Sequence, residues 1–248
     1  MQSIARVRRS VQDARRAYNR LSRWYDALAN ASEGPLRDRG LQVLAAQPGE
    51  RVLEIGFGTG HALVSLAQAV APLDCAAAPL DFTAAPSGYV VGVDISDGMA
   101  AVAGQRLTKA GCAERVALAL ADGARLPFAA GSFDAAFISF TLELFDTPLL
   151  PSVLASCREN LKPAGRLCVV ALAKDLSGDA LPARLYELAH RRLPRWVDCR
   201  PIFVGPLLQA HGFCIVASIR HAMWGLPVDV VLARKSEGGL VNGAEFIP

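Results

Sequence analysis

The chain has 248 residues, of which 52% are hydrophobic and 20% are charged, and its formal net charge is +3. This length and composition suit one globular α/β domain with a sizeable core, and they exclude a disordered protein. Residues 1–40 hold nine arginines against four acids while the rest is close to neutral, so we expect no nucleic-acid partner.

Several kinds of segment are missing from the sequence. No run of 18 apolar residues lacks a charge, so no transmembrane helix is expected. The N-terminus lacks an apolar signal core, and we expect a cytoplasmic protein; a mitochondrial transit peptide is the second interpretation of the arginine-rich start. The six cysteines include no Cys-x-x-Cys pair and have no zinc-ligand spacing to a histidine, so we expect reduced thiols and no metal site.

The first predicted element is an arginine-rich helix. Its apolar residues recur at alternating spacings of three and four, and they are Ile4, Val7, Val11, Ala14, Tyr18, Leu21, Tyr25 and Leu28. The sequence SEGP at 32–35 is expected to end or interrupt this helix, and Pro35 can open a second one over 35–46. We therefore take 1–46 as an N-terminal helical arm.

From residue 51 strand-like and helix-like runs alternate, which predicts a doubly wound, mostly parallel, seven-stranded α/β sheet within a domain of residues 47–235. The expected strands are 51–55, 89–94, 116–121, 134–140, 166–173, 213–220 and 226–233. The expected helices are 60–71, 97–110, 148–161, 178–192 and 203–211.

Three connecting segments refine this architecture. The last two strands are joined by a link too short for a parallel crossover, so they are expected to pair antiparallel. The Pro/Ala-rich segment 72–88 is aperiodic and predicts a loop insertion. Residues 236–248 contain several glycines and are expected to form a flexible tail.

The first strand runs directly into a glycine loop, RVLEIGFGTGH, at residues 51–61. Such a loop lets a ligand approach the backbone and the N-terminus of the next helix. A dinucleotide loop has the spacing Gly-x-Gly-x-x-Gly, but here His61 occupies the last position and Gly60 comes one residue early. A phosphate loop would need a lysine that this stretch lacks.

The next two strands also end in acidic residues. YVVGVDIS ends with Asp94, which can accept hydrogen bonds from both hydroxyls of a ribose, and VALALADG places Asp122 and Gly123 at the third strand end. Dinucleotide enzymes share the first of these acids, so an NAD-type oxidoreductase stays open as an alternative.

The pattern Glu-x-Gly-x-Gly-x-Gly from Glu54 to Gly60 resembles motif I of the class I S-adenosylmethionine-dependent methyltransferases, and the later strand-end motifs follow in the order of that fold. The resemblance implies S-adenosylmethionine as cofactor and S-adenosylhomocysteine as product. It implies that Met99 packs on the adenine and that Asp122 takes the adenine amino group. The implied cofactor residues are Tyr18, Glu54, Gly56, Gly58, Gly60, Asp94, Ile95, Met99, Asp122, Gly123 and Ser139.

The N-terminal stretch AYNRLSRWYD is similar to the paired Tyr-Asp motif of the ubiquinone/menaquinone C-methyltransferases, in which the tyrosine region helps close the cofactor site. Asn19 and Ala164 depart from that group, and the C-terminal MWGLPVDVVLARK does not match its ending. We expect residues 1–28 to form a lid with Tyr18 and Tyr25 near the ligand. The arginines outside the apolar stripe would face solvent or, alternatively, an anionic membrane surface.

Motifs that the sequence lacks reduce the number of possible classes of methyl acceptor. The fourth strand ends in SFTLELF, without the Asn/Asp-Pro-Pro-aromatic motif of enzymes that methylate exocyclic amines and without a Pro-Cys nucleophile. We therefore expect a small-molecule acceptor, either a quinol-like carbon, a thiol or other soft nucleophile, or a lipid-like molecule. A non-catalytic protein that binds the cofactor on the same fold is a further alternative.

Few side chains are candidates for binding the methyl acceptor or for removing its proton. His61, Glu143 and Tyr25 are the candidate catalytic residues, because the acceptor proton needs a base. Two of them also fit a plainer role: His61 as a solvated residue in the first turn of a helix, and Glu143 as an acid at the surface or at the start of a helix. The candidate acceptor-binding residues are Arg200, Cys199 and Trp224; a structural salt bridge is the alternative for Arg200, and a core position is the alternative for Trp224.

Overall fold

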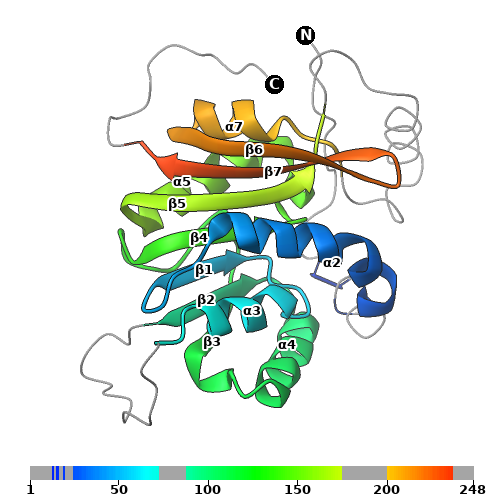
Figure 1. The fold of residues 1–248 in the computed structure, drawn as a ribbon, viewed down its shortest axis with the longest axis vertical. Helices are drawn as coiled ribbons and strands as arrows, with labels where there is room; N and C mark the ends of the chain where they lie inside the picture. The colour runs from blue at the N-terminus through cyan, green and yellow to red at the C-terminus, as the bar shows by residue number, and fades with distance from the viewer. Residues whose placement is uncertain are drawn as a thin grey trace.

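The computed structural model describes residues 13, 15–16, 19, 25–72, 88–174 and 200–236, and for residues 25–31 it describes the backbone only. Its centre is a seven-stranded sheet with the order β3-β2-β1-β4-β5-β7-β6 (Figure 1). The strands are β1 (Arg51–Ile55), β2 (Tyr89–Asp94), β3 (Val116–Leu120), β4 (Phe133–Ser139), β5 (Leu161–Leu172), β6 (Phe213–Met223) and β7 (Leu226–Lys235).

The strand directions confirm the predicted fold class. β1 to β5 run parallel to one another, whereas β7 runs antiparallel to both β5 and β6. The expected antiparallel last pair is therefore confirmed. β5 begins five residues before its predicted start, because Leu161 already pairs with Phe133 across an irregularity in the ladder.

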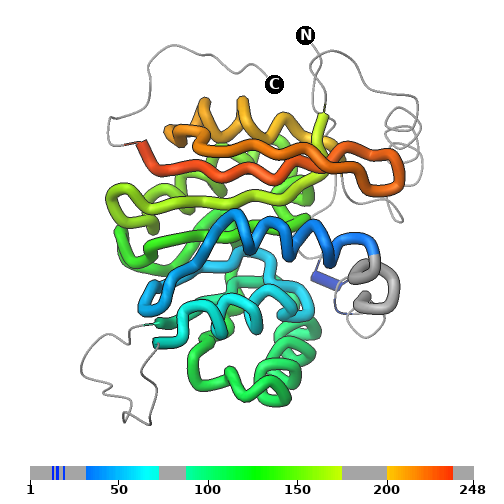
Figure 2. Tube along the Cα trace, in the orientation of Figure 1, coloured from blue at the N-terminus to red at the C-terminus, as the bar shows by residue number. Residues whose placement is uncertain are grey.

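Helices cover both faces of the sheet. The longer ones are α2 (Tyr25–Leu44), α3 (His61–Ala69), α4 (Asp97–Lys109), α5 (Leu150–Asn160) and α7 (Val204–Ala210), and three short 3₁₀ turns are η1 (Ala113–Arg115), η2 (Leu142–Leu144) and η3 (Thr147–Leu149). Residues of α2, α3 and α4 share one apolar cluster with the sheet, and α5 and α7 share the other. Figure 2 traces α2, α3 and α4 along the same face.

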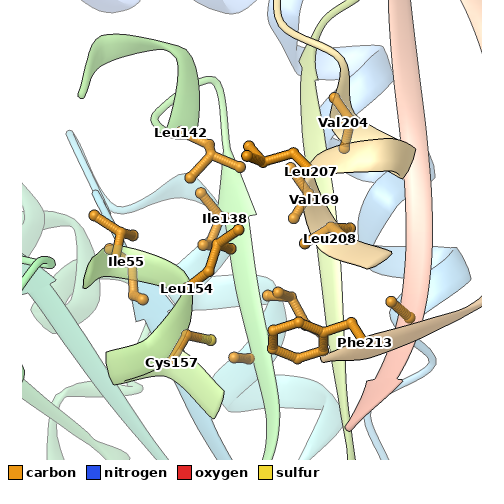
Figure 3. Close-up of a cluster of buried hydrophobic side chains, with 14 of the residues drawn as sticks. Ile55, Ile138, Leu142, Leu154, Cys157, Val169, Val204, Leu207, Leu208 and Phe213 are labelled. Carbon is orange, nitrogen blue, oxygen red and sulfur yellow. The ribbon is translucent and has the colours of Figure 1, made fainter. Parts of the chain in front are cut away.

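Alternating strand residues supply the two clusters. On β4, Ala135 and Phe137 belong to the cluster under α2, while Ala136 and Ile138 belong to the cluster under α5 and α7. Figure 3 shows the second cluster, in which the side chains of α5 and α7 meet those of β1, β4 and β5. The core therefore lies on both sides of the strands whose ends form the site.

The expected break at residues 32–35 is wrong. α2 is continuous from Tyr25 to Leu44 with Pro35 inside it. Tertiary packing compensates for the missing hydrogen bond of the proline, because α2 lies against β4, β5 and β7. A Cβ added to Gly40 would lie 2.4 Å from Cγ2 of Val170, so a glycine is needed where the helix approaches the sheet.

Other predictions fall outside the described residues. These are the helix at 178–192, the body of the 72–88 insertion, the C-terminal tail after residue 236 and most of the 1–28 helix. Within the described ranges, no helix combines the length and apolar character that a membrane crossing requires.

Candidate cofactor and acceptor site

The glycine loop and Asp94 lie at the point where neighbouring strands of the sheet are connected in opposite directions. β1 lies between β2 and β4, so the chain leaves β1 toward one side and returns on the other. In open α/β sheets, ligands bind in the crevice outside the carboxyl ends of such strands. The glycine loop, Asp94 and the residues after Ser139 all lie at these ends.

The glycine loop has a backbone shape that other residues adopt only with strain. Gly56 and Gly58 have φ values of 76° and 52°. A Cβ on Gly56 would lie 2.2 Å from Oγ1 of Thr141, whereas a Cβ on Gly58 would meet nothing within 4 Å. Gly56 is therefore closed in by protein, and Gly58 leaves space that a ligand can use.

Asp94 joins the glycine loop to the start of α4. Its carboxylate accepts hydrogen bonds from the backbone N–H of Gly58 at 2.9 Å and of Ser96 at 2.9 Å. Burial raises the pKa of Asp94, and the backbone N–H groups of Ser96, Gly58 and Ile95 oppose that rise. Asp94 thus contacts the loop directly, and the partly buried Ile95 follows it in the chain; their role in cofactor binding remains a prediction.

Glu54 is a buried carboxyl on β1 with an exposed fraction of 3%. Its Oε2 has no hydrogen-bond partner among the described residues. Burial raises its pKa to about 8; the charge of Arg37 opposes this rise, and the charge of Asp94 adds to it. A buried acceptor without a partner is costly, so this oxygen fits a cationic group of a ligand such as the ammonium of S-adenosylmethionine.

The remaining cofactor candidates occupy different environments. Met99 is buried in the cluster beneath α3 and α4. Asp122 accepts a hydrogen bond from the backbone N–H of Ala124 at 2.9 Å. A Cβ on Gly123 would lie 2.8 Å from Cγ2 of Ile55, so the end of β3 packs against the end of β1. Ser139 is partly buried at the end of β4.

Thr141 supports the glycine loop, and sequence reasoning missed it. Its hydroxyl donates to the carbonyl of Ser139 at 2.9 Å and lies 3.4 Å from the carbonyl of Gly56. The preceding Phe140 has a φ of 48°, a left-handed conformation that is uncommon outside glycine. No motif marks this residue, because its role depends on β1 and β4 being neighbours.

Glu143 and Arg200 meet beyond the ends of β4 and β5. Glu143 is 0% exposed, its Oε1 accepts from the backbone N–H of Leu172 at 3.2 Å, and its Oε2 has no partner among the described residues. Burial raises its pKa to about 8, opposed by hydrogen bonds from its own backbone and from Leu172. The charge of Glu33 raises this pKa further, and that of Arg200 lowers it. Glu143 is therefore an enclosed carboxyl, and the alternative of a surface acid is wrong.

The side chain of Arg200 is buried and forms hydrogen bonds within the protein. It is 1% exposed, and its guanidinium donates to the carbonyls of Glu143 at 3.3 Å and Phe145 at 2.6 Å and to the hydroxyl of Thr147 at 3.2 Å. These contacts clamp the segment after β4 that carries Glu143. Binding of an acceptor anion by Arg200 remains a prediction.

Of the remaining candidates, the structure describes the side chains of His61 and Trp224 only. His61 is the partly buried first residue of α3. Trp224 is 76% exposed in the turn between β6 and β7, so the core alternative for it is wrong. Tyr25 begins α2, but its side chain is not described, and Tyr18 and Cys199 lie outside the described residues.

The N-terminal arm reaches the start of α4. Arg15 donates to the carboxylate of Asp97 at 3.0 Å, and the Asn19 amide donates to the same oxygen at 2.9 Å. Oδ1 of Asn19 accepts from the Ser96 hydroxyl at 2.5 Å and from the Gly98 N–H at 3.1 Å. These partners are more than 75 residues away along the chain, so local sequence carries no signal for them.

Known proteins resemble this chain in both sequence and fold. Residues 52–165 match the family described as a methyltransferase domain. The nocamycin O-methyltransferase of Saccharothrix syringae is 34% identical over 220 residues, which cover 83% of this chain and 69% of that protein. The chain belongs to the class I S-adenosylmethionine-dependent methyltransferases.

Two further matches place this methyltransferase among its relatives. The ubiquinone/menaquinone biosynthesis C-methyltransferase UbiE of Ectopseudomonas mendocina is 33% identical over 59% of this chain, and the match spans 50% of the relative's length. The solved structure of the [4+2]-cyclase SpnF superposes with a TM-score of 0.71 at 17% identity, over 96% of this chain and 100% of SpnF. The likeness to SpnF shows the fold alone.

S-adenosylmethionine is the cofactor of this family. The open space at Gly58, the carboxylate of Asp94 and the unpartnered oxygen of Glu54 fit its ribose and ammonium groups. Among the described residues, no group of three or more His, Cys, Asp or Glu side chains could hold a metal ion.

Proposed function

We propose that this methyltransferase transfers a methyl group from S-adenosylmethionine to a hydroxyl oxygen of a small molecule. The similarity to the nocamycin O-methyltransferase over most of the chain carries this proposal. The acceptors expected from the sequence were a quinol-like carbon, a soft nucleophile such as a thiol, or a lipid-like molecule. A quinol-like carbon is the second candidate, because UbiE methylates carbon by its name.

Both candidate acceptors carry a hydroxyl proton, and Glu143 is the residue proposed to take it. Its Oε2 is unpartnered among the described residues, and Arg200 fixes the segment that holds it. When Glu143 is ionised, its carboxylate can accept the hydroxyl proton. The acceptor oxygen then forms its bond to the methyl carbon while the bond from that carbon to sulfur breaks, which leaves a neutral thioether.

Asp94, Glu54 and the glycine loop are proposed to orient the cofactor during this transfer. The bound sulfonium supplies the activated methyl group, so the protein's task is to align it and to remove one proton. Because the pKa of Glu143 is raised to about 8, we expect kcat/KM to rise with pH and level off above that value.

The test is a transfer assay with methyl-labelled S-adenosylmethionine and three acceptor sets: phenols and enols, quinols, and thiols. Mass spectrometry locates the labelled methyl group, and we expect it on oxygen. Glu143→Gln should lower turnover by about 10²–10⁴-fold without weakening S-adenosylhomocysteine binding. Glu114→Gln, at an exposed position in η1, is the matched control. Labelling of thiols alone, or an unchanged rate in Glu143→Gln, would contradict the proposal.

A further inference from the structure

The contacts of Asn19 with the start of α4 use both ends of its amide. Gly98 N–H can only donate and the Asp97 carboxylate accepts, so the carbonyl of Asn19 must face Gly98 and its NH₂ group must face Asp97. The same carbonyl accepts from the Ser96 hydroxyl. One side chain of the arm thus satisfies a helix N–H, a hydroxyl and a carboxylate at once.

Ser96 transmits this contact to the cofactor loop. It is 0% exposed, and its hydroxyl accepts from the backbone N–H of Met99 while donating to Asn19. Its own backbone N–H donates to Asp94, and the other oxygen of Asp94 accepts from Gly58. A continuous series of hydrogen bonds therefore links Asn19, Ser96, Asp94 and the glycine loop.

Loss of Asn19 would leave buried groups without partners. The Ser96 hydroxyl has no contact with solvent, so removing its acceptor leaves an unsatisfied donor beside Asp94. Gly98 N–H belongs to the first turn of α4, whose N–H groups have no partner within the helix. The segment from Asp94 to Gly98 would then lose the contact that fixes its conformation.

We propose that Asn19 is a positioning residue for cofactor binding: it fixes Ser96 and thereby Asp94, so arm docking and cofactor binding strengthen each other. This inference rests on S-adenosylmethionine binding at Asp94. Because coupling between two sites is reciprocal, the cofactor should also hold the arm more firmly on α4.

The choice of Asn over Asp at residue 19 provides a sharp variant. Asp would still accept from Ser96 and Gly98, but it could no longer donate to Asp97, and it would add a second negative charge facing that carboxylate. Asn19→Asp should therefore weaken binding, with a loss that increases at low ionic strength. Asn19→Ala removes all three contacts without adding charge.

The experiment measures S-adenosylhomocysteine affinity by calorimetry and the melting temperature of the cofactor-free protein for each variant. Asn19→Ala should weaken binding about five- to thirtyfold, the effect of losing a partner of a buried polar group. Arg16→Ala, an exposed neighbour on the same arm, should bind like the native protein. Amide exchange at Gly98 and Met99 should slow on ligand binding in the native protein and slow less in Asn19→Ala.

The outcomes separate this inference from the family assignment. If the native protein fails to bind S-adenosylhomocysteine, the cofactor site itself is wrong. If the native protein binds and Asn19→Ala binds equally well, Asn19 is not a positioning residue. A lower melting temperature with unchanged affinity would show a purely structural contact and would likewise overturn the inference.

Discussion

At the scale of single residues, the site contains two enclosed glutamates with raised pKa values. Glu54 and Glu143 lie on different elements, and each keeps one oxygen without a partner among the described residues. Burial disfavours the charged form of a carboxyl, so both groups stay largely protonated at neutral pH until a ligand supplies a partner. The ionisation of Glu54 and Glu143 is therefore coupled to ligand binding.

This coupling predicts the pH dependence of folding. The pKa of Glu143 is about 8 in the folded protein and near 4.5 when unfolded, so the unfolded state binds fewer protons between these values. Stability should fall as pH rises from about 4.5 to 8, by up to about 1.4 kcal/mol per pH unit for each such group. Glu143→Gln should remove one group's share of that slope in urea unfolding curves. A slope that matches the native protein would contradict the assignment, and Glu114→Gln is the control.

At the scale of elements, most strands could be predicted from the sequence. The periodicity of hydrophobic residues and the motifs at the strand ends depend only on residues that are close together in the chain. β1 and β2 have the predicted bounds, and the other strands and described core helices were predicted with shifts at their ends. The continuity of α2 was missed, since it depends on packing around Gly40. The enclosure of Glu143 was missed too, because its surroundings come from Leu172 and Arg200 far along the chain.

The hairpin between β6 and β7 offers a test at this scale. Met223 pairs with Leu226, so the turn residues are Trp224 and Gly225, both with positive φ. Asn-Gly is the favoured pair in such two-residue turns, whereas a left-handed tryptophan costs about 1–2 kcal/mol. Since the ring is mostly exposed, Trp224→Asn should stabilise the protein by about 1 kcal/mol in urea unfolding.

Trp224→Ala is the matched variant for the hairpin, because it removes the ring but keeps a left-handed non-glycine residue. If packing of the ring supported the fold, both variants would be less stable than the native protein, and the turn interpretation would fail. A raised KM for the acceptor in both variants, with unchanged cofactor affinity, would instead support the predicted acceptor contact of Trp224.

At the scale of the whole molecule, the predicted cofactor residue Asp94 contacts several elements of the fold. Asp94 connects β2, the glycine loop after β1 and the start of α4, and the arm joins through Asn19. A ligand bound there should stabilise the entire fold, since it binds the folded state only. The candidate site thus holds several elements of the domain together and is also the proposed site of the reaction.

Thermal unfolding with and without ligand measures this stabilisation. S-adenosylhomocysteine at a hundredfold excess over its dissociation constant should stabilise the native protein by about 2.7 kcal/mol. Asp94→Asn keeps the shape of the side chain but removes its charge, so at the same ligand concentration the stabilisation should be clearly smaller. Equal stabilisation of both proteins would disprove the role of Asp94.

The C-terminal end of α2 lies near the amino ends of β1 and β4, away from the glycine loop, where Arg166 of β5 donates to the carbonyls of Leu44 and Ala45 and pairs with Glu50. Together with Gly40, this clamp makes α2 part of the domain it covers. Anyone who grafts the catalytic core onto another protein must carry residues 25–46 with it. A transferable form of this domain therefore begins before α2, and not at β1.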